Sequence, residues 1–580
     1  MTKILDGLRP KKTSEHHRVD ERFVDGPGIH RPGIVFVISV ALIGLFTLWA
    51  AVAPDSLNTV MTDMANWVTS TVGWSYLIVP LLCIGFLLFL ACTRYGSIRL
   101  GKPDDRPDFS TWAWLAMILS AVMGIGLISY GVAEPISHFM APPHALAEPG
   151  TMDAAVRAMQ YSFFDWGPHA WGIFGVFGLA IAWSTHRKGR SGLISAMLRP
   201  VLGKLVDGWF GKAVDIAAIT ATLFGTTTSL GLGSSVIDEG MNRIFGTPSG
   251  VGTQVVIIVV VTILFTLSAL SGVHRGVKYI SQTTTVIAIG LAAYVLIFGP
   301  TNFISNLFVR SLGQYFGDFF TTSLTTPLNA DDMQWMQWWT YFMMAWWLSW
   351  GAFVGVFLAK ISKGRTIRQF VAGVLAVPSL VFFLWFTIFG GTAIKIDMDT
   401  NGAVSTATNE NINNAFFAML EGLPLVQVTS VAAILLVALF FISGADANTY
   451  VLGMLSCEGT MFPRRPILLV WGILTGLCAI VLLIAGGLLA LQQAALLSAL
   501  PFTVIIALLG IALLKELRSD PQYQALHPHI VEVAAVPGPI TPAAPTNEHE
   551  DETGSDNGSS TEHAPMADAG RTNGRSSEHA

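Results

Sequence analysis

Long apolar segments recur along this chain of 580 residues, and they constrain its fold more than any other feature. Each is about 20 residues long, the length that an α-helix needs to cross the hydrocarbon core of a bilayer. Because lipid offers the backbone no hydrogen-bond partners, we expect all of these segments to be helical. Twelve segments qualify, near residues 34–53, 76–93, 112–132, 168–185, 213–234, 254–271, 278–299, 338–358, 371–391, 425–444, 467–488 and 497–514.

The composition agrees with a polytopic membrane protein. Hydrophobic residues make up 52% of the chain and charged residues only 12%, whereas about 25% of a soluble domain is charged. A disordered protein, a coiled coil and an ordinary soluble enzyme are therefore excluded. The polar start of the chain predicts no cleavable signal peptide, and the four cysteines show no spacing that implies disulfides or a metal.

Basic residues predict the orientation of the chain. With the N-terminus inside, 29 of the 33 Lys and Arg fall on the cytoplasmic side, as the positive-inside rule requires. Both termini are then cytoplasmic. We expect an N-terminal tail at 1–33, a membrane domain at 34–515 with an amphipathic helix along its outer surface near 301–320, and a largely disordered acidic tail at 516–580.

Glycines interrupt two of the apolar segments at matching places. They lie within 121–127 of the third segment and 350–355 of the eighth, five segments apart. This spacing favours two inverted five-helix repeats, with a binding site at mid-membrane beside unwound helix. The alternative is that the glycines only let helices pack closely.

Aromatic residues gather near the same two regions. Six of the 17 Trp fall within 335–350, some of them well inside the eighth segment, and a second group surrounds the start of the fourth. Aromatic faces hold a quaternary ammonium through its positive charge, although such a group can also be simple packing. The residues singled out are Trp166, Trp171, Phe174, Trp346, Trp347 and Trp350.

Two further polar features lie in apolar segments. Thr222 and Thr226 are one helical turn apart, and their hydroxyls suit Na⁺ as well as ordinary bonds to backbone carbonyls. Asp446 borders the tenth segment, where an acid indicates function by default. Its place near the cytoplasmic edge equally fits a structural cap or a gate contact.

Several of these stretches together resemble the betaine/carnitine/choline transporter (BCCT) family. The most specific is 346–368, which is similar to the family's eighth-span signature, and the stretch from Met123 to Pro135 is similar to its glycine stretch. The resemblance covers about 32–515. It implies an all-α, LeuT-like secondary transporter with spans 3–7 and 8–12 as inverted repeats, normally a homotrimer, carrying a trimethylammonium or similar compatible solute.

The resemblance also implies roles for individual residues. It implies an aromatic box, an access path at Trp350, a stretch that faces a carboxylate, and two sodium sites. The box is Trp166, Trp171, Phe174 and Trp347, and the carboxylate stretch is Met123, Gly124 and Gly126. The sodium sites are Thr222, Thr226 and Phe353 for one, and Met123, Phe440, Ser443 and Gly444 for the other. The chain departs from the family pattern in having Phe174 where Tyr is common and Gly444 where Ser is common.

The favoured function is sodium-driven uptake of a zwitterionic solute such as glycine betaine or ectoine across the cell membrane. A carnitine- or choline-type carrier working by exchange or on protons is the alternative. A membrane redox enzyme would need His pairs inside spans, and of the 13 His only His169 lies in a predicted one. An ion channel would need a repeated filter-like loop, and we find none in the sequence. We therefore expect no enzyme and no cofactor apart from Na⁺ as coupling ion.

Overall fold

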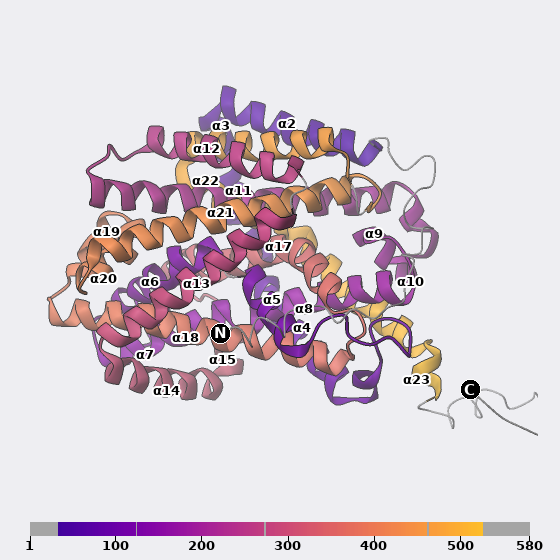
Figure 1. The fold of residues 1–580 in the computed structure, drawn as a ribbon, viewed down its shortest axis with the longest axis horizontal. Helices are drawn as coiled ribbons and strands as arrows, with labels where there is room; N and C mark the ends of the chain where they lie inside the picture. The colour runs from indigo at the N-terminus through magenta and orange to yellow at the C-terminus, as the bar shows by residue number, and fades with distance from the viewer. Residues whose placement is uncertain (1–32, 123, 272–273, 461–462, 526–580) are drawn as a thin grey trace, which may run out of the picture. The chain divides into compact units, whose positions relative to one another are not determined.

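A computed structural model describes residues 33–122, 124–271, 274–460 and 463–525, and helix is the regular structure throughout these ranges. Figure 1 shows several long helices side by side, among them α11, α12 and α21. The long helices are α2 (Ile34–Val52), α4 (Ser75–Cys92), α11 (Trp209–Phe245), α12 (Val251–Ser271), α13 (His274–Phe298), α17 (Thr340–Ile361), α18 (Ile367–Asp399), α21 (Val426–Ser456) and α22 (Arg465–Arg518). The other helices are α3 (Pro54–Val72), α5 (Thr111–Val122), α6 (Ile125–Met140), α7 (Met152–Trp166), α8 (Pro168–Ala182), α9 (Ile194–Met197), α10 (Arg199–Leu202), α14 (Thr301–Gly317), α15 (Phe319–Leu324), α16 (Ala330–Trp338), α19 (Ala403–Glu410), α20 (Ala415–Glu421) and α23 (Pro521–Ala525).

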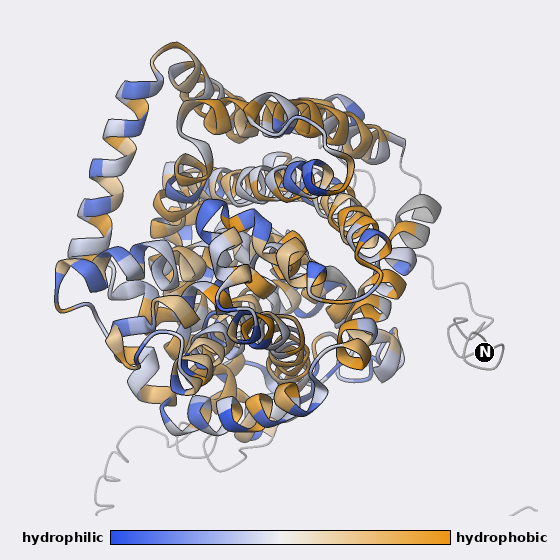
Figure 2. Ribbon diagram, turned by 90° about the vertical axis from the view of Figure 1, so that its left-hand side faces the viewer, coloured by the Kyte–Doolittle hydropathy of each residue, from blue (hydrophilic) through white to orange (hydrophobic). Residues whose placement is uncertain are grey.

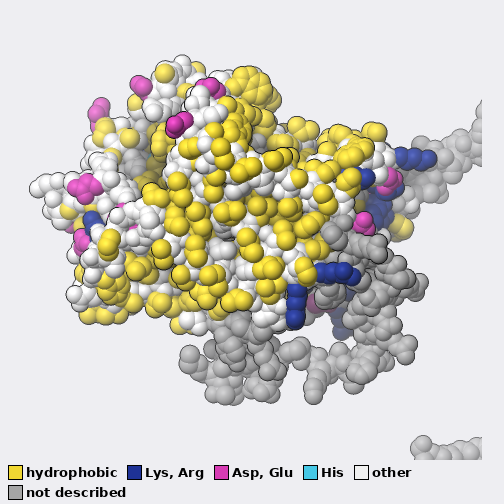
Figure 3. Space-filling model, turned by 90° about the horizontal axis from the view of Figure 1, so that it is seen from above, with side chains coloured by type: hydrophobic (Ala, Val, Ile, Leu, Met, Phe, Trp, Pro, Cys, Tyr) yellow, Lys and Arg dark blue, Asp and Glu magenta, His cyan; other side chains and the backbone are white. Residues whose placement is uncertain are grey.

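The outer face of the helices is apolar, as a bilayer requires. Hydrophobic residues predominate along the long helices (Figure 2) and cover most of the face in Figure 3, where most of the visible Lys and Arg gather at one end. Large apolar side chains such as Leu45, Val256, Ile263 and Ile484 are exposed. A patch of this size on a soluble protein would be an aggregation site, so the prediction of an all-helical multi-span membrane protein is confirmed.

The helices account for the twelve apolar segments, although not one for one. Eight helices of the described ranges are long and apolar enough to cross a membrane, or nine if the bent pair Gln282–Phe298 and Thr301–Gly317 forms one span. The last two apolar segments share α22, whose 54 residues would extend about 80 Å at 1.5 Å per residue. Non-helical backbone at Gly486 and Gly487 breaks this helix. The count of twelve spans stays a prediction.

The two glycine stretches behave differently. In the third segment α5 ends at Val122 and α6 begins at Ile125, with Gly124 in an extended conformation (φ −130°, ψ −175°), so the predicted interruption is confirmed. In the eighth segment the prediction is wrong, because α17 runs without a break from Thr340 to Ile361. The reason is packing: a Cβ at Gly351 would lie 2.3 Å from Phe177 of α8.

The surface segment near 301–320 is helical, as predicted. α14 covers Thr301–Gly317 and is bent by 107° from the end of α13. Its buried residues Ile304, Leu307, Ser311 and Tyr315 recur at helical spacing, which is the pattern of an amphipathic helix. Its position along the membrane surface remains a prediction. The predicted N-terminal tail lies outside the described residues, and so does the acidic tail beyond 525.

The contact between α8 and α17 gives a direct test of the fold. Gly351→Ala should lower the melting temperature of the purified full-length protein, because the added methyl overpacks buried Phe177 and costs about 1–3 kcal/mol. Gly85→Ala is the matched control, since a Cβ there meets no atom within 4 Å. Equal melting temperatures for Gly351→Ala and the wild-type protein would contradict this packing.

Candidate functional site

Four of the predicted aromatic residues come together where three helices meet. Trp166 ends α7, Trp171 and Phe174 lie in the first half of α8, and Trp347 lies in α17. The ring centroids of Trp166 and Trp347 are 4.9 Å apart with an interplanar angle of 72°, and Phe174 lies 6.0 Å from Trp347. Trp171 is 5.6 Å from Phe174, also edge-on. All four side chains are buried. We call these four residues the aromatic box.

Local backbone features place these rings. Gly167 separates α7 from α8, and Pro168 starts α8 at a position where proline is favoured. A Cβ at Gly167 would come within 2.6 Å of the Phe383 ring, so a larger residue would not fit at this corner. Gly126 of α6 has a similar role, because its Cβ would lie 2.5 Å from Trp166. The first turn of α6 therefore begins directly against the box.

Hydrogen bonds fix the orientation of the indole rings. The Trp166 Nε1–H donates to Glu134 Oε2 at 2.7 Å, and the Trp347 Nε1–H donates to the carbonyl oxygen of Asp165 at 2.7 Å. Both bonds lie at the ring edges and satisfy the only polar atom of each side chain. The ring faces are left for apolar contacts or for a cation.

The structure adds an aromatic residue that the sequence analysis missed. Phe382 of α18 lies 5.6 Å from Trp166, nearly parallel to it, and 6.0 Å from Trp171. Phe386, one turn further along α18, lies 5.1 Å from Trp166. The sequence carries an aromatic run at 382–386, within the predicted ninth span.

Trp350 lies apart from the box. It is one turn beyond Trp346 on α17, with which it makes an edge contact at 6.4 Å, and its other ring contact is Phe353 at 5.4 Å. A Cβ on Gly225 of α11 would come within 2.7 Å of its ring. Trp350 therefore lies between α17 and α11, next to the predicted sodium residues. Its proposed place on an access path stays a prediction.

The predicted sodium residues lie on helices that pack together. α11 carries Thr222 and Thr226 and packs against both α17, with Phe353, and α21, with Phe440 and Ser443. The Thr222 hydroxyl is buried without a hydrogen-bond partner among the described residues, so its oxygen is available to a cation.

The remaining hydroxyls of these two sets already have partners. Thr226 donates to the Thr222 carbonyl at 3.0 Å and accepts a hydrogen bond from Asn448, which the sequence analysis missed. Ser443 donates to the Phe440 carbonyl at 3.2 Å. Met123 lies outside the described residues, so its predicted roles cannot be placed.

Asp446 has a structural contact. α21 continues to Ser456, which places Asp446 inside a helix rather than at the end of one. Its carboxylate accepts a hydrogen bond from Ser268 of α12 at 2.8 Å. This contact favours a structural role for Asp446.

A multi-span helical membrane protein with a buried aromatic box fits the class of membrane transporters. The comparison with known families is specific: the model of the betaine/carnitine/choline family transporters (BCCT) matches residues 34–522. The chain therefore belongs to the BCCT family of secondary transporters, and the resemblance seen in the sequence is confirmed.

Three relatives illustrate the family. The glycine betaine transporter OpuD of Bacillus subtilis is 45% identical over 84% of this chain and 94% of its own length. The ectoine/hydroxyectoine transporter of Virgibacillus pantothenticus is 38% identical over 82% of this chain and 94% of its own. The betaine/ectoine transporter LcoP of Corynebacterium glutamicum is 36% identical over 84% of this chain and 78% of its own.

The bond between Trp166 and Glu134 makes a testable contribution to stability. Trp166→Phe keeps a ring but removes the indole N–H, and the buried carboxyl loses its donor. We expect a lower melting temperature, corresponding to about 1–3 kcal/mol. Trp49→Phe is the control, because Trp49 is exposed. The assignment is wrong if both variants melt like the wild-type protein.

Proposed function

We propose that this protein takes up a zwitterionic compatible solute, glycine betaine or ectoine, across the cell membrane and that a sodium gradient drives the uptake. The relatives named for these solutes are 36–45% identical to this chain over most of its length. Accumulation of such a solute balances external osmotic pressure, so osmoprotection is the physiological role that we infer.

The observation that carries the proposal is the aromatic box. Edge-to-face contacts link its four rings in series, from Trp166 to Trp347, Phe174 and Trp171, and the N–H groups of Trp166 and Trp347 are bonded to other partners. A trimethylammonium cannot donate a hydrogen bond, so the quadrupoles of such ring faces are its best ligands. Phe382 supplies a further face.

The first turn of α6 supports the assignment of the solute's other end. Gly126 lies against Trp166, and the N-terminus of a helix attracts a carboxylate through its free N–H groups and its dipole. Gly124, which precedes this first turn, has extended backbone and makes no side-chain cap. A zwitterion with its cation in the box would therefore place its carboxylate near Gly124 and Gly126.

Sodium coupling is supported by the hydroxyls of α11. The buried Thr222 oxygen has no partner in the described ranges, and a hard cation with oxygen ligands would satisfy it. Thr226 and Phe353 complete the set that we propose for one ion, and Met123, Phe440 and Ser443 the set for another.

The finer architecture is also part of the proposal. We infer twelve spans, two inverted five-helix repeats in a LeuT-like arrangement, cytoplasmic termini and a homotrimer. The length of α22 and its break at Gly486 support two spans in that region. Because α17 is continuous, only the third span supports the repeats through an interrupted helix.

Uptake into proteoliposomes tests the function. Radiolabelled glycine betaine and ectoine should accumulate above the external concentration when an inward sodium gradient is imposed, and accumulation should stop when the gradient is removed. Accumulation that persists without sodium and follows a proton gradient or internal solute would support the carnitine- or choline-type alternative. No accumulation of either solute under any gradient would overturn the proposal.

Trp347→Ala tests the box itself. Loss of a desolvated ring removes about 2 kcal/mol of cation–π attraction, so we expect at least tenfold weaker equilibrium binding of glycine betaine. Trp67→Ala, which removes an exposed ring from α3, should bind normally. Near-normal affinity in Trp347→Ala would remove Trp347 from the box.

A further inference from the structure

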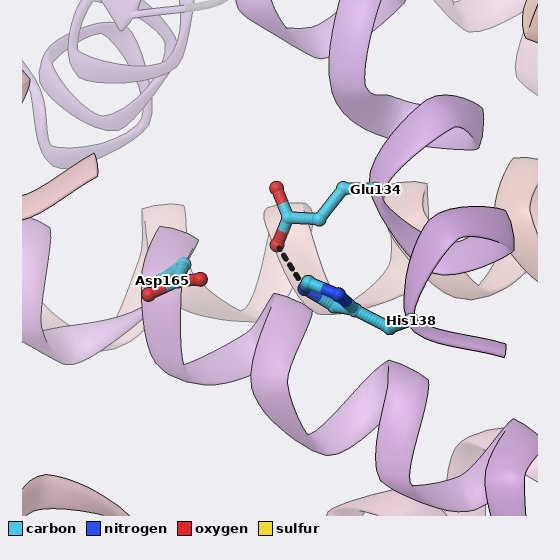
Figure 4. Close-up of side chains that lie close together, drawn as sticks. All are labelled: Glu134, His138 and Asp165. Atoms are coloured by element: carbon cyan, nitrogen blue, oxygen red, sulfur yellow. Dashed lines mark ion pairs between the residues drawn. The ribbon is translucent and has the colours of Figure 1, made fainter. Parts of the chain in front are cut away.

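Two carboxyl groups and an imidazole form a buried cluster beside the aromatic box (Figure 4). Glu134 and His138 are one turn apart on α6, and Asp165 lies at the end of α7. One ligand atom from each lies within 4.8 Å of the others, and Glu134 Oε1 is 3.7 Å from His138 Nε2. All three side chains are 0% exposed. We call these three residues the acid–histidine cluster.

The cluster lacks the hydrogen bonds that buried polar groups normally have. Glu134 Oε1, both carboxylate oxygens of Asp165 and both ring nitrogens of His138 make no hydrogen bond of normal geometry among the described residues, although the hydroxyls of Ser162 and Thr340 lie close enough to act on the Glu134 and Asp165 carboxyl groups. Trp335 and Trp339 flank the His138 ring at 5.0 and 4.8 Å. Burying even one uncompensated carboxylate costs several kcal/mol, so the cluster must take up positive charge.

Neighbouring side chains do not supply that charge. The guanidinium of Arg157, which is on α7 like Asp165, is in an ion pair with Asp318 at 2.6 Å. His144 is paired with Asp332 at 3.5 Å. The titratable or charged groups that face the cluster from its surroundings are Tyr130, His144, Arg157, Tyr161, Asp318 and Asp332. None of the described Lys or Arg side chains forms an ion pair with Glu134 or Asp165.

The cluster touches two rings of the box. Glu134 accepts the Trp166 indole N–H, and the backbone carbonyl of Asp165 accepts that of Trp347. An ionised carboxylate is a stronger acceptor than a neutral carboxyl group, and it places negative potential behind the Trp166 ring. A cation in the box therefore binds more tightly when Glu134 is ionised, and linkage requires that the cation in turn favours ionisation.

We propose that Glu134, His138 and Asp165 form a proton-binding site that holds a proton when the box is empty and releases it when a cation-bearing solute enters. The O–H bond of a carboxyl group breaks, the proton passes to water, and the solute's ammonium takes over the neutralising charge. The inference rests on the proposed function, because the box must accept such a solute.

The geometry favours a proton over a metal ion. Ligands bound to Zn²⁺ at 2.0–2.2 Å would have their donor atoms within about 3.5 Å of one another. Glu134 Oε1 and His138 Nε2 are 3.7 Å apart, so the side chains would have to move closer together to hold such an ion. A proton held by one of the carboxyl groups needs no such movement.

Calorimetric titration of the full-length protein in nanodiscs with glycine betaine tests the linkage. Run in two buffers of different ionisation enthalpy, it should show about one proton released per solute bound, and affinity that rises as the pH is raised. Glu134→Gln keeps an acceptor for Trp166 but should release no proton and show a flat pH profile. Asp165→Asn should reduce the release in the same way. Asp215→Asn is the control, because that buried carboxyl is hydrogen-bonded to Ser195 instead.

The outcomes separate this inference from the proposed function. Tight binding without proton release in the wild-type protein would overturn it, and so would a stoichiometric metal ion in the purified protein that a chelator removes. If glycine betaine does not bind at all, the proposed function fails. Infrared spectroscopy then tests the proton site alone: a protonated-carboxyl band that disappears in Glu134→Gln or Asp165→Asn supports the site, and its absence from the wild-type protein overturns it.

Discussion

The close contact between α8 and α17 determines where the aromatic rings lie. Gly351 and Gly355 of α17 face Phe177, and Cβ atoms there would come within 2.3 and 2.7 Å of it. Without side chains at these positions the two helices approach until Phe174 meets Trp347. Packing of this kind, small residues against a large one, is how helices associate in lipid, where water supplies no hydrophobic force. The box depends on this spacing.

The aromatic box is buried, and a few hydrogen bonds hold its rings. Two indole N–H groups have fixed acceptors, Glu134 for Trp166 and the Asp165 carbonyl for Trp347. In such a low-dielectric environment the attraction between a cation and a ring is stronger than at an exposed surface. The same environment makes the unpaired carboxyl groups behind the rings sensitive to any charge that enters. The proposed solute recognition and the proposed proton binding thus depend on one buried arrangement.

The sequence predicted the membrane class and the helical segments, because these depend on composition and on local runs of residue types, whereas the four box residues were named through the family resemblance. It did not predict contacts that arise only when distant helices pack. Phe382, on α18, contacts Trp166. The glycines of α17, which suggested a broken helix, pack against Phe177 instead. Likewise α6 continues to Met140, beyond the predicted end at 132. That extension buries His138 next to Glu134, which hydropathy alone did not indicate.

The central claim is that the box recognises positive charge rather than shape. The most direct measurement compares equilibrium binding of glycine betaine with that of 3,3-dimethylbutanoate, in which carbon replaces the ammonium nitrogen and the carboxylate is kept. We expect at least tenfold weaker binding of the analogue that lacks the cation, because about 2 kcal/mol of cation–π attraction is lost. Equal affinities would show that the rings act only as an apolar pocket and would contradict the account.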